Sequence, residues 1–381
     1  MNLISLRYSE FEGEPRTWKV DGLTLREVNL LVGKNASGKT RTLNVIKGLA
    51  AILSQDKPLQ YSSGDYETVF RHDSQVLKYT LKYSNQLVTR EEFSIDGKSL
   101  LKRGDKGIGE IFAVKENRWI EFQTPQDRVA AAARRDSIQH PYFEALFQWG
   151  YELRHFPFGT SLGQDYLAVI TKEGPLADPK DPNQVAGVYK RGCKELGDSY
   201  NRAIMDDLAS VGYDIEEVGL GQPPALKVLP QMSVKGELVA LFVKERGLRD
   251  AMYQNDMSQG MFRVLSMIIH LNFAVMGSRP SCILVDDIGE GLDFDRSCRL
   301  IKLLIDKASH SSVQLIMATN DRFVMNSVPL EAWSVLRREG GFCRVYNYEN
   351  SKKIFDEFKF TGLNNFDFLA FDYISEANVG D

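Results

Sequence analysis

The clearest pattern along the chain is an apolar run followed by a glycine-rich polar stretch and then a helical repeat. Residues 28–32, Val-Asn-Leu-Leu-Val, form the apolar run, which predicts a buried strand. Beyond the polar stretch, apolar side chains recur at helical spacing at Leu43, Ile46, Leu49, Ala50 and Leu53. One face of a helix should therefore pack against the rest of the protein. The order is strand, loop and helix.

The loop at residues 33–40 reads Gly-Lys-Asn-Ala-Ser-Gly-Lys-Thr, a full G-x-x-x-x-G-K-T phosphate loop. The glycines let backbone N–H groups turn inward around phosphates, the lysine reaches the β- and γ-phosphate oxygens, and the threonine hydroxyl can bind Mg²⁺. The residues predicted to contact the nucleotide are Gly33, Lys34, Asn35, Ala36, Ser37, Gly38, Lys39, Thr40 and Thr42. The loop predicts binding of ATP or GTP. ATP is favoured because the sequence has no N-K-x-D guanine motif.

A second apolar run, residues 282–285, ends in the two carboxylates Asp286 and Asp287. It is typical of a Walker B strand buried on both faces. At the C-terminal edge of such a strand, Asp286 is predicted to hold Mg²⁺, together with Thr40. Asp287 is predicted to activate the attacking water.

Residues 257–260, Met-Ser-Gln-Gly, precede Arg263 and a helical apolar stretch. This segment resembles the L-S-G-G-Q signature of ABC-type ATPases, in the L-S-x-G form of SMC, RecF and OLD-like heads. The resemblance implies that Ser258, Gln259 and Gly260 bind the γ-phosphate of an ATP held by another subunit. Residues 288–293 resemble the D-loop of that family, with Asp293 as the matched residue. A helix-capping role is the alternative for both Ser258 and Asp293.

The sequence departs from the family at two positions. Asn320 stands where the family carries a switch histidine, and Asp287 stands where most relatives carry glutamate. Asparagine can hydrogen-bond a γ-phosphate without a positive charge, and aspartate is one methylene shorter than glutamate. Slow turnover is therefore predicted, with Lys39, Asp287 and Asn320 as the catalytic residues. Gln123 is the predicted Q-loop metal ligand, with Gln126 as the competing choice.

The predicted fold class is α/β, a P-loop NTPase of the ABC ATPase head type with an antiparallel β subdomain and an inserted helical subdomain. Alternating runs at 66–70, 76–83 and 87–93 predict the β meander. The predicted boundaries are 1–125 for the N-terminal lobe with Walker A and the meander, 126–235 for the helical insertion, 236–350 for the C-terminal lobe with signature, Walker B, D-loop and switch, and 351–381 for the tail.

The composition of the chain says more about its cellular location and possible partners than about the reaction it catalyses. The 381 residues carry a net charge of −4, and the four cysteines show no C-x-x-C spacing. The longest apolar stretch, 264–276, is interrupted by polar residues and is shorter than the roughly 20 residues of a membrane span. A cytoplasmic protein with reduced thiols and no membrane insertion is expected. A basic cluster at Lys102, Arg103, Lys106, Arg128, Arg134 and Arg135 leaves nucleic acid as an alternative partner.

The resemblance implies heads that dimerise around ATP, as a homodimer or with a related ATPase subunit, to control a partner protein or nucleic acid. The alternative is an ATP-gated scaffold with little hydrolysis that holds a toxin or nuclease effector in a bacterial anti-phage defence complex. A transporter motor is disfavoured, because the insertion between Walker A and the signature is long and begins with a β meander.

Overall fold

The computed structural model describes residues 1–55, 57–166, 168–170, 176–224, 237–277, 282–311 and 313–374. The chain forms two compact units that interleave in sequence. Unit 1 contains residues 1–153, 316–320 and 328–381, and unit 2 contains residues 154–315 and 321–327. This division differs from the four predicted segments, because residues 126–153 and the C-terminal helices both belong to unit 1.

A large mixed sheet forms the body of unit 1. Its strands are β1 (Asn2–Glu10), β2 (Trp18–Thr24), β3 (Val28–Val32), β4 (Ser63–His72), β5 (Gln75–Ser84), β6 (Leu87–Ile95), β7 (Lys98–Arg103), β8 (Ile108–Ala113), β9 (Arg118–Gln123), β17 (Trp333–Glu339), β18 (Phe342–Asn347) and the end of β16 (Gln314–Ala318). The order is β16-β3-β17-β18-β2-β1-β4-β5-β6-β7-β8-β9. β3 pairs with β17 and β18 with β2 in parallel, whereas the pairs from β2 through β9 are antiparallel. The predicted meander therefore forms and continues to β9.

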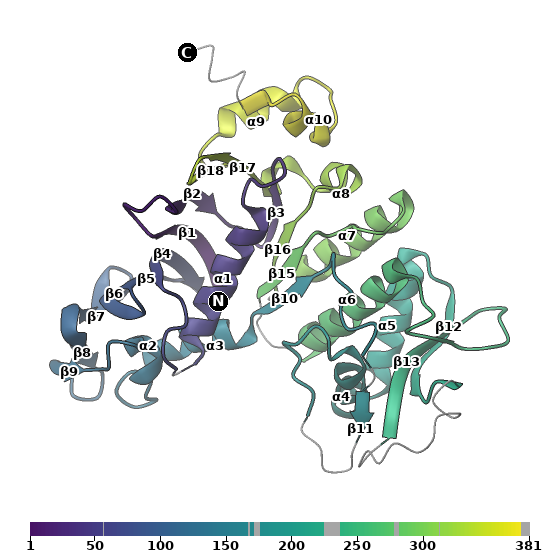
Figure 1. Cartoon of the computed structure of the whole chain (residues 1–381), viewed down its shortest axis with the longest axis horizontal. Coiled ribbons are helices and arrows are strands. Elements are labelled where there is room, and N and C mark those ends of the chain that lie inside the picture. The colour runs from purple at the N-terminus through teal and green to yellow at the C-terminus, as the bar shows by residue number, and fades with distance from the viewer. Residues whose placement is uncertain are drawn as a thin grey trace. The chain divides into compact units, whose positions relative to one another are not determined.

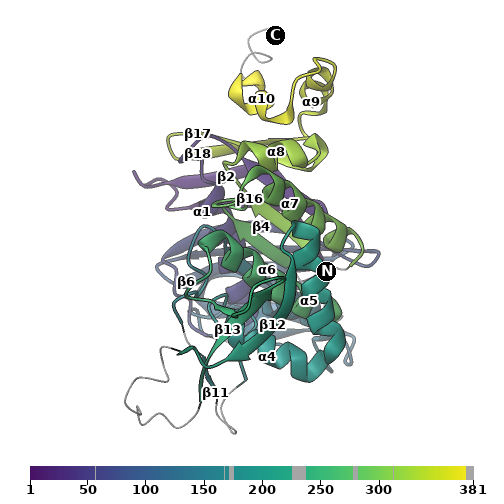
Figure 2. The ribbon, with the colours of Figure 1, turned by 90° about the vertical axis from the view of Figure 1, so that its right-hand side faces the viewer.

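The helices of unit 1 are α1 (Lys39–Leu53), α2 (Ala130–Ala133), α3 (Glu144–Glu152), α9 (Lys352–Lys359) and α10 (Asn365–Ala370). Helix α1 packs on α3 so closely that a Cβ at Gly150 would lie 2.4 Å from the Ala50 carbonyl oxygen. Figures 1 and 2 show α9 and α10, in yellow, beside the β17–β18 hairpin. The C-terminal segment is therefore a helix pair of unit 1, which the apolar pattern did not predict.

The basic cluster predicted to meet nucleic acid is partly internal. Arg103 and Glu91 form an ion pair at 3.0 Å with both side chains fully buried. The Glu91 carboxylate also accepts hydrogen bonds from the backbone N–H groups of Ala130 and Ala131, at 2.7 and 2.8 Å, and so fixes the start of α2. Arg134 donates to the Gln123 carbonyl oxygen. Arg103 is therefore internal and cannot be part of the predicted nucleic-acid patch, whereas Arg134 is only partly buried.

Unit 2 combines helices with short strands. Its helices are α4 (Val185–Leu196), α5 (Asp198–Val211), α6 (Gln259–Met276), α7 (Phe294–Ser309) and α8 (Arg322–Ser327), and its strands include β10 (Arg154–Pro157), β11 (Ala168–Ile170), β12 (Ile215–Gly221), β13 (Glu237–Glu245), β14 (Met252–Tyr253) and β15 (Cys282–Asp286). β10 pairs in parallel with β15, and β13 pairs antiparallel with β11, β12 and β14. Figure 2 shows α4 and α5 alongside the β12–β13 hairpin. Helices α4 and α5 meet at Gly197, and both lie within residues 126–235, where the sequence predicts helices.

Helix α6 is the core helix of unit 2. Its residues from Gly260 to Ala274 are buried, and it packs against α4 and α5. Among the described residues, α6 is the one helix that is long and apolar enough to cross a membrane by length and composition, and 83% of that span is buried inside the protein. Burial on all sides explains the apolar composition of this helix.

Candidate functional site

The predicted phosphate loop lies in unit 1 between β3 and α1, in the order that the sequence predicts. The Lys39 ammonium group crosses the loop and donates hydrogen bonds to the carbonyl oxygens of Gly33 and Lys34, at 2.9 and 3.4 Å. Lys39 is only 6% exposed, so its charge is held inside the loop. A fixed positive charge thus coincides with the N-terminus of a 15-residue helix, which is an arrangement suited to binding an anion.

Buried side chains fix the loop from behind. Gly38 has a φ of 105°, which favours glycine, and a Cβ there would make a tight contact of 3.3 Å with the Trp18 ring. The Cys343 thiol donates to the Ser37 carbonyl oxygen at 3.3 Å. Burial raises the pKa of Cys343 to about 11, which keeps this thiol protonated and able to donate. The loop is therefore held in shape by unit 1 itself.

The two threonines after the loop are placed differently. Thr40 is exposed at the start of α1, together with Asn35 on the loop. Thr42 is fully buried, and its hydroxyl donates to the Gly38 carbonyl oxygen at 2.9 Å. Thr40 is accessible to solvent, whereas Thr42 stabilises the loop from inside. Nucleotide contact by the Thr42 side chain stays a prediction, and the contact that the structure gives this hydroxyl is with Gly38.

Asn320 is brought close to the phosphate loop within unit 1. The backbone N–H of Thr319 donates to the carbonyl oxygen of Leu31 in β3, at 3.3 Å. Asn320 is the next residue and is exposed. It therefore lies level with the end of the strand from which the phosphate loop starts.

Gln123 is not brought to the phosphate loop. It is the last residue of β9, and β9 lies at the opposite end of the unit 1 strand order from β3. Its side-chain amide donates to the Lys106 carbonyl oxygen at 3.4 Å. The prediction of Gln123 as a metal ligand is therefore wrong, because the strand before it is the edge of the meander.

In unit 2 the predicted Walker B strand is present as β15, and all of its residues are buried. Asp286 ends the strand, and its carbonyl oxygen accepts a hydrogen bond from the backbone N–H of Phe158 at 2.9 Å. Asp287 follows with a φ of 54°, a left-handed conformation that aspartate tolerates better than most residues. The backbone turn therefore directs Asp287 away from the direction of the strand.

A second carboxylate, which the sequence did not single out, lies beside Asp287. A Cβ added to Gly159 would lie 2.6 Å from Glu290 Oε2 and 3.2 Å from Asp287 Cβ. Both acidic side chains therefore border the same small space over Gly159. Glu290 is in the segment that resembles the D-loop, and that position was the signal in the sequence that could have found it.

Arg263 joins the signature helix to this acidic turn. Its guanidinium donates to the carbonyl oxygens of Gly159, Thr160 and Glu290, at 2.9, 2.9 and 2.8 Å. Close packing adds to these bonds, because a Cβ at Gly260 would lie 2.5 Å from the Gly291 carbonyl oxygen. We call the set of segments 159–160, 258–263 and 286–293 the signature corner. Its parts are far apart in sequence, and the buried Arg263 side chain bonds to two of the other segments at once.

Ser258 and Asp293 both act as helix N-caps. The Ser258 hydroxyl accepts a hydrogen bond from the Met261 N–H at 3.3 Å, and the Asp293 carboxylate accepts one from the Arg296 N–H at 2.9 Å. The bond from the Arg296 backbone holds the pKa of Asp293 below its usual value. The capping alternative is thus present in the structure for both residues. Ser258 and Gln259 are exposed at the tip of α6.

No protein-family model and no curated protein matches the chain. Several solved structures do match. An SMC head bound to the C-winged helix domain of ScpA aligns with 93% of this chain and 100% of its own, at 12% identity and a TM-score of 0.54. An SMC head domain from Thermotoga maritima aligns with 91% and 99%, at 15% identity and a TM-score of 0.46. An Smc head domain with an extended coiled coil, bound to the C-terminal domain of ScpA derived from Pyrococcus furiosus, aligns with 93% and 98%, at 12% identity and a TM-score of 0.49.

The first of these matches shows the fold. The chain has the α/β fold of an SMC head, with a large mixed sheet and a phosphate loop between β3 and α1. The predicted fold class is confirmed at that level.

Proposed function

We propose that this protein is an ABC-class ATPase that binds ATP with Mg²⁺ at the phosphate loop and pairs two heads around the nucleotide. The observation that carries the proposal is the phosphate loop, where the buried Lys39 ammonium and the start of α1 meet. In the proposed pair, Ser258, Gln259 and Gly260 of one head bind the triphosphate held by Lys39 of the other. The exposed tip of α6 supports this role, because its N-terminal amides can bind an anion.

The donor set also suits the metal. The Thr40 hydroxyl is exposed, and Asp286 supplies a carboxylate, and both are the hard oxygen ligands that Mg²⁺ takes. When bound, Mg²⁺ neutralises negative charge on the phosphates. Asp287 acts as the base for the attacking water, with Glu290 beside it, and Asn320 hydrogen-bonds the γ-phosphate. Slow hydrolysis is expected because Asn320 carries no charge and Asp287 has a short side chain.

Binding is tested by replacing Lys39 with alanine and titrating a fluorescent ATP analogue. The loss of a charge-assisted bond of about 1.5–3 kcal/mol should weaken binding by roughly 10- to 150-fold. Lys47→Ala is the matched control, because Lys47 is an exposed lysine of the same helix. Equal affinity of the Lys39→Ala variant and the wild type would remove the assignment.

Pairing of heads is tested by light scattering with ATP and Mg²⁺ on the Asp287→Asn variant, in which hydrolysis should be blocked. We expect a dimer that disappears when Ser258→Arg is added, and that persists with Ser309→Arg, a control at the exposed end of α7. A monomer under all of these conditions contradicts the pairing. A protein partner is part of the same proposal, since the matched SMC head is bound to one. Affinity capture with the ATP-trapped dimer would identify it.

A further inference from the structure

The C-terminal helix pair is firmly attached to unit 1. Phe355 and Phe358 of α9 pack on Phe368 of α10, with ring centroids 4.7 and 5.0 Å apart. The Asn365 side-chain amide donates to the Val328 carbonyl oxygen at 2.9 Å, and Lys359 forms an ion pair with Glu331. An aromatic cluster and two polar contacts near the junction of the helices therefore hold the helix pair on unit 1.

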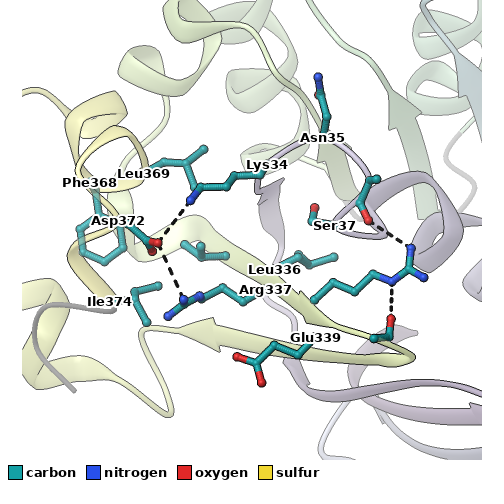
Figure 3. A pocket seen from close by; sticks show the side chains of 14 residues that line it. Lys34, Asn35, Ser37, Leu336, Arg337, Glu339, Phe368, Leu369, Asp372 and Ile374 are labelled. Carbon is teal, nitrogen blue, oxygen red and sulfur yellow. Dashed lines mark hydrogen bonds and ion pairs between the residues drawn. The ribbon is translucent and has the colours of Figure 1, made fainter. Parts of the chain in front are cut away.

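This attachment places α10 beside the phosphate loop. A cavity of about 530 Å³ lies between them. Three parts of unit 1 line it: residues 34–37 of the loop, residues 335–340 of β17 and the tip of its hairpin, and Phe368, Leu369, Asp372 and Ile374 at the end of the helix pair. Figure 3 shows the Lys34 side chain directed across the cavity toward Asp372.

The Asp372 carboxylate forms ion pairs with two basic side chains that line the cavity. Its Oδ2 atom lies 3.3 Å from Lys34 Nζ and 3.7 Å from the Arg337 guanidinium. Asp372 has a φ of 52°, so the backbone turn after α10 directs this carboxylate. Lys34 is the second residue of the phosphate loop, so a carboxylate of the C-terminal segment is bonded to the nucleotide site.

We propose that Asp372 is a positioning residue of the nucleotide site, which turns the Lys34 ammonium away from the triphosphate and so lowers the affinity for ATP. This inference rests on the proposed binding of ATP at the loop. The expected decrease in ATP affinity follows from charge. The Asp372 carboxylate pairs with the Lys34 ammonium, which could otherwise approach the phosphates, and it adds a negative charge near an anionic ligand.

The geometry also allows release of Lys34. The Lys34 side chain is 74% exposed, so the pair is screened by solvent and is weak. When Lys34 leaves, Asp372 keeps its contact with Arg337, so no carboxylate is left unpaired. ATP and Asp372 therefore compete for Lys34, and undocking of the helix pair would raise the affinity of the loop for ATP.

The test is the ATP affinity of the Asp372→Asn variant, measured with a fluorescent analogue at low salt. We expect the dissociation constant to fall about threefold, and the difference to shrink at higher salt. Asparagine keeps the left-handed backbone of this position, and Asp372→Gly, measured in parallel, does the same if the first variant folds poorly. Glu357→Gln is the matched control, because Glu357 is a half-exposed carboxylate of α9 paired with Lys353.

A double-mutant cycle assigns the effect to Lys34. Lys34→Met should weaken ATP binding more in the Asp372→Asn background than in the wild type. Unchanged or weaker ATP binding by folded Asp372→Asn and Asp372→Gly overturns the proposal, as does an equal gain in Glu357→Gln. Failure of the proposed function is a different result, in which the wild type itself shows no Lys39-dependent binding.

Discussion

The phosphate loop of unit 1 and the signature corner of unit 2 are built in opposite ways. The loop is one contiguous stretch whose lysine bonds to carbonyls five and six residues away. The corner joins three stretches, and Arg263 reaches carbonyls more than 100 residues before it and 27 residues after it. The functional lysine of the loop is held by bonds within the loop, whereas the corner depends strongly on one buried side chain that links distant segments. The two sites should therefore respond to different substitutions.

The sharpest test of this contrast is Arg263→Ala. It leaves buried carbonyl oxygens without their charged donor, and the free energy of unfolding of unit 2 should fall by about 3–5 kcal/mol. ATP hydrolysis should be lost, while ATP binding at the phosphate loop stays within about twofold if the loop is independent. Denaturant unfolding and nucleotide titration measure the two quantities. A parallel loss of ATP affinity would show that the two sites are not separate.

The next effect depends on pH. His270, in the core helix of unit 2, has its pKa lowered from 6.5 to about 4 because burial disfavours the charged ring. As pH falls, His270 is protonated in the unfolded chain before it is protonated in the folded protein. The stability that depends on the neutral ring is therefore fully present above pH 6.5 and is lost as pH falls toward 4. The loss from this residue should reach about 3 kcal/mol. The free energy of unfolding, measured by denaturant unfolding at several pH values from 7 to 4, should fall more steeply with pH in the wild type than in His270→Phe. An equal fall in the two proteins would contradict the prediction.

A smaller effect is expected in the phosphate loop. Gly38→Ala forces a residue with a Cβ to adopt a φ of 105° against the Trp18 ring, at a cost of about 1–3 kcal/mol. ATP affinity should fall, while the thermal unfolding of unit 2 does not change. Gly340→Ala, at the tip of the β17–β18 hairpin, is the control, because it also has a positive φ but has open space around it. Equal effects of the two substitutions on ATP affinity would refute a role for the packing against Trp18.

The smallest effect should come from Ser258→Ala. Loss of the N-cap of α6 should cost about 1 kcal/mol of stability. If Ser258 also binds the triphosphate of a second head, ATP-dependent dimerisation should weaken beyond that amount. Ser258→Asp provides the comparison, because aspartate also caps a helix N-terminus but its carboxylate would repel a triphosphate. ATP-dependent dimerisation that is as strong in Ser258→Asp as in the wild type would leave Ser258 as a cap alone.

The contrast between the contiguous phosphate loop and the dispersed signature corner also explains which features the sequence could predict. The strand at 28–32, the loop, the helix after it and the strand ending at Asp286 all follow from patterns within a few residues, and the structure contains each of them. The partners of Arg263 and the place of Gly159 depend on tertiary contacts that no local pattern encodes. Gln123 was wrongly expected near the phosphate loop, because a strand-like run identifies a strand but not its place in the sheet. The C-terminal helices were missed because both are short, at eight and six residues.

The left-handed turn at Asp287 limits which residues this position can hold. A left-handed backbone favours asparagine, aspartate and glycine over longer side chains, so a short acid and the shape of its turn belong together. Asp287→Glu would lengthen the side chain but would also strain the main chain. A longer acid at this position would therefore require the turn to be rebuilt together with the residue.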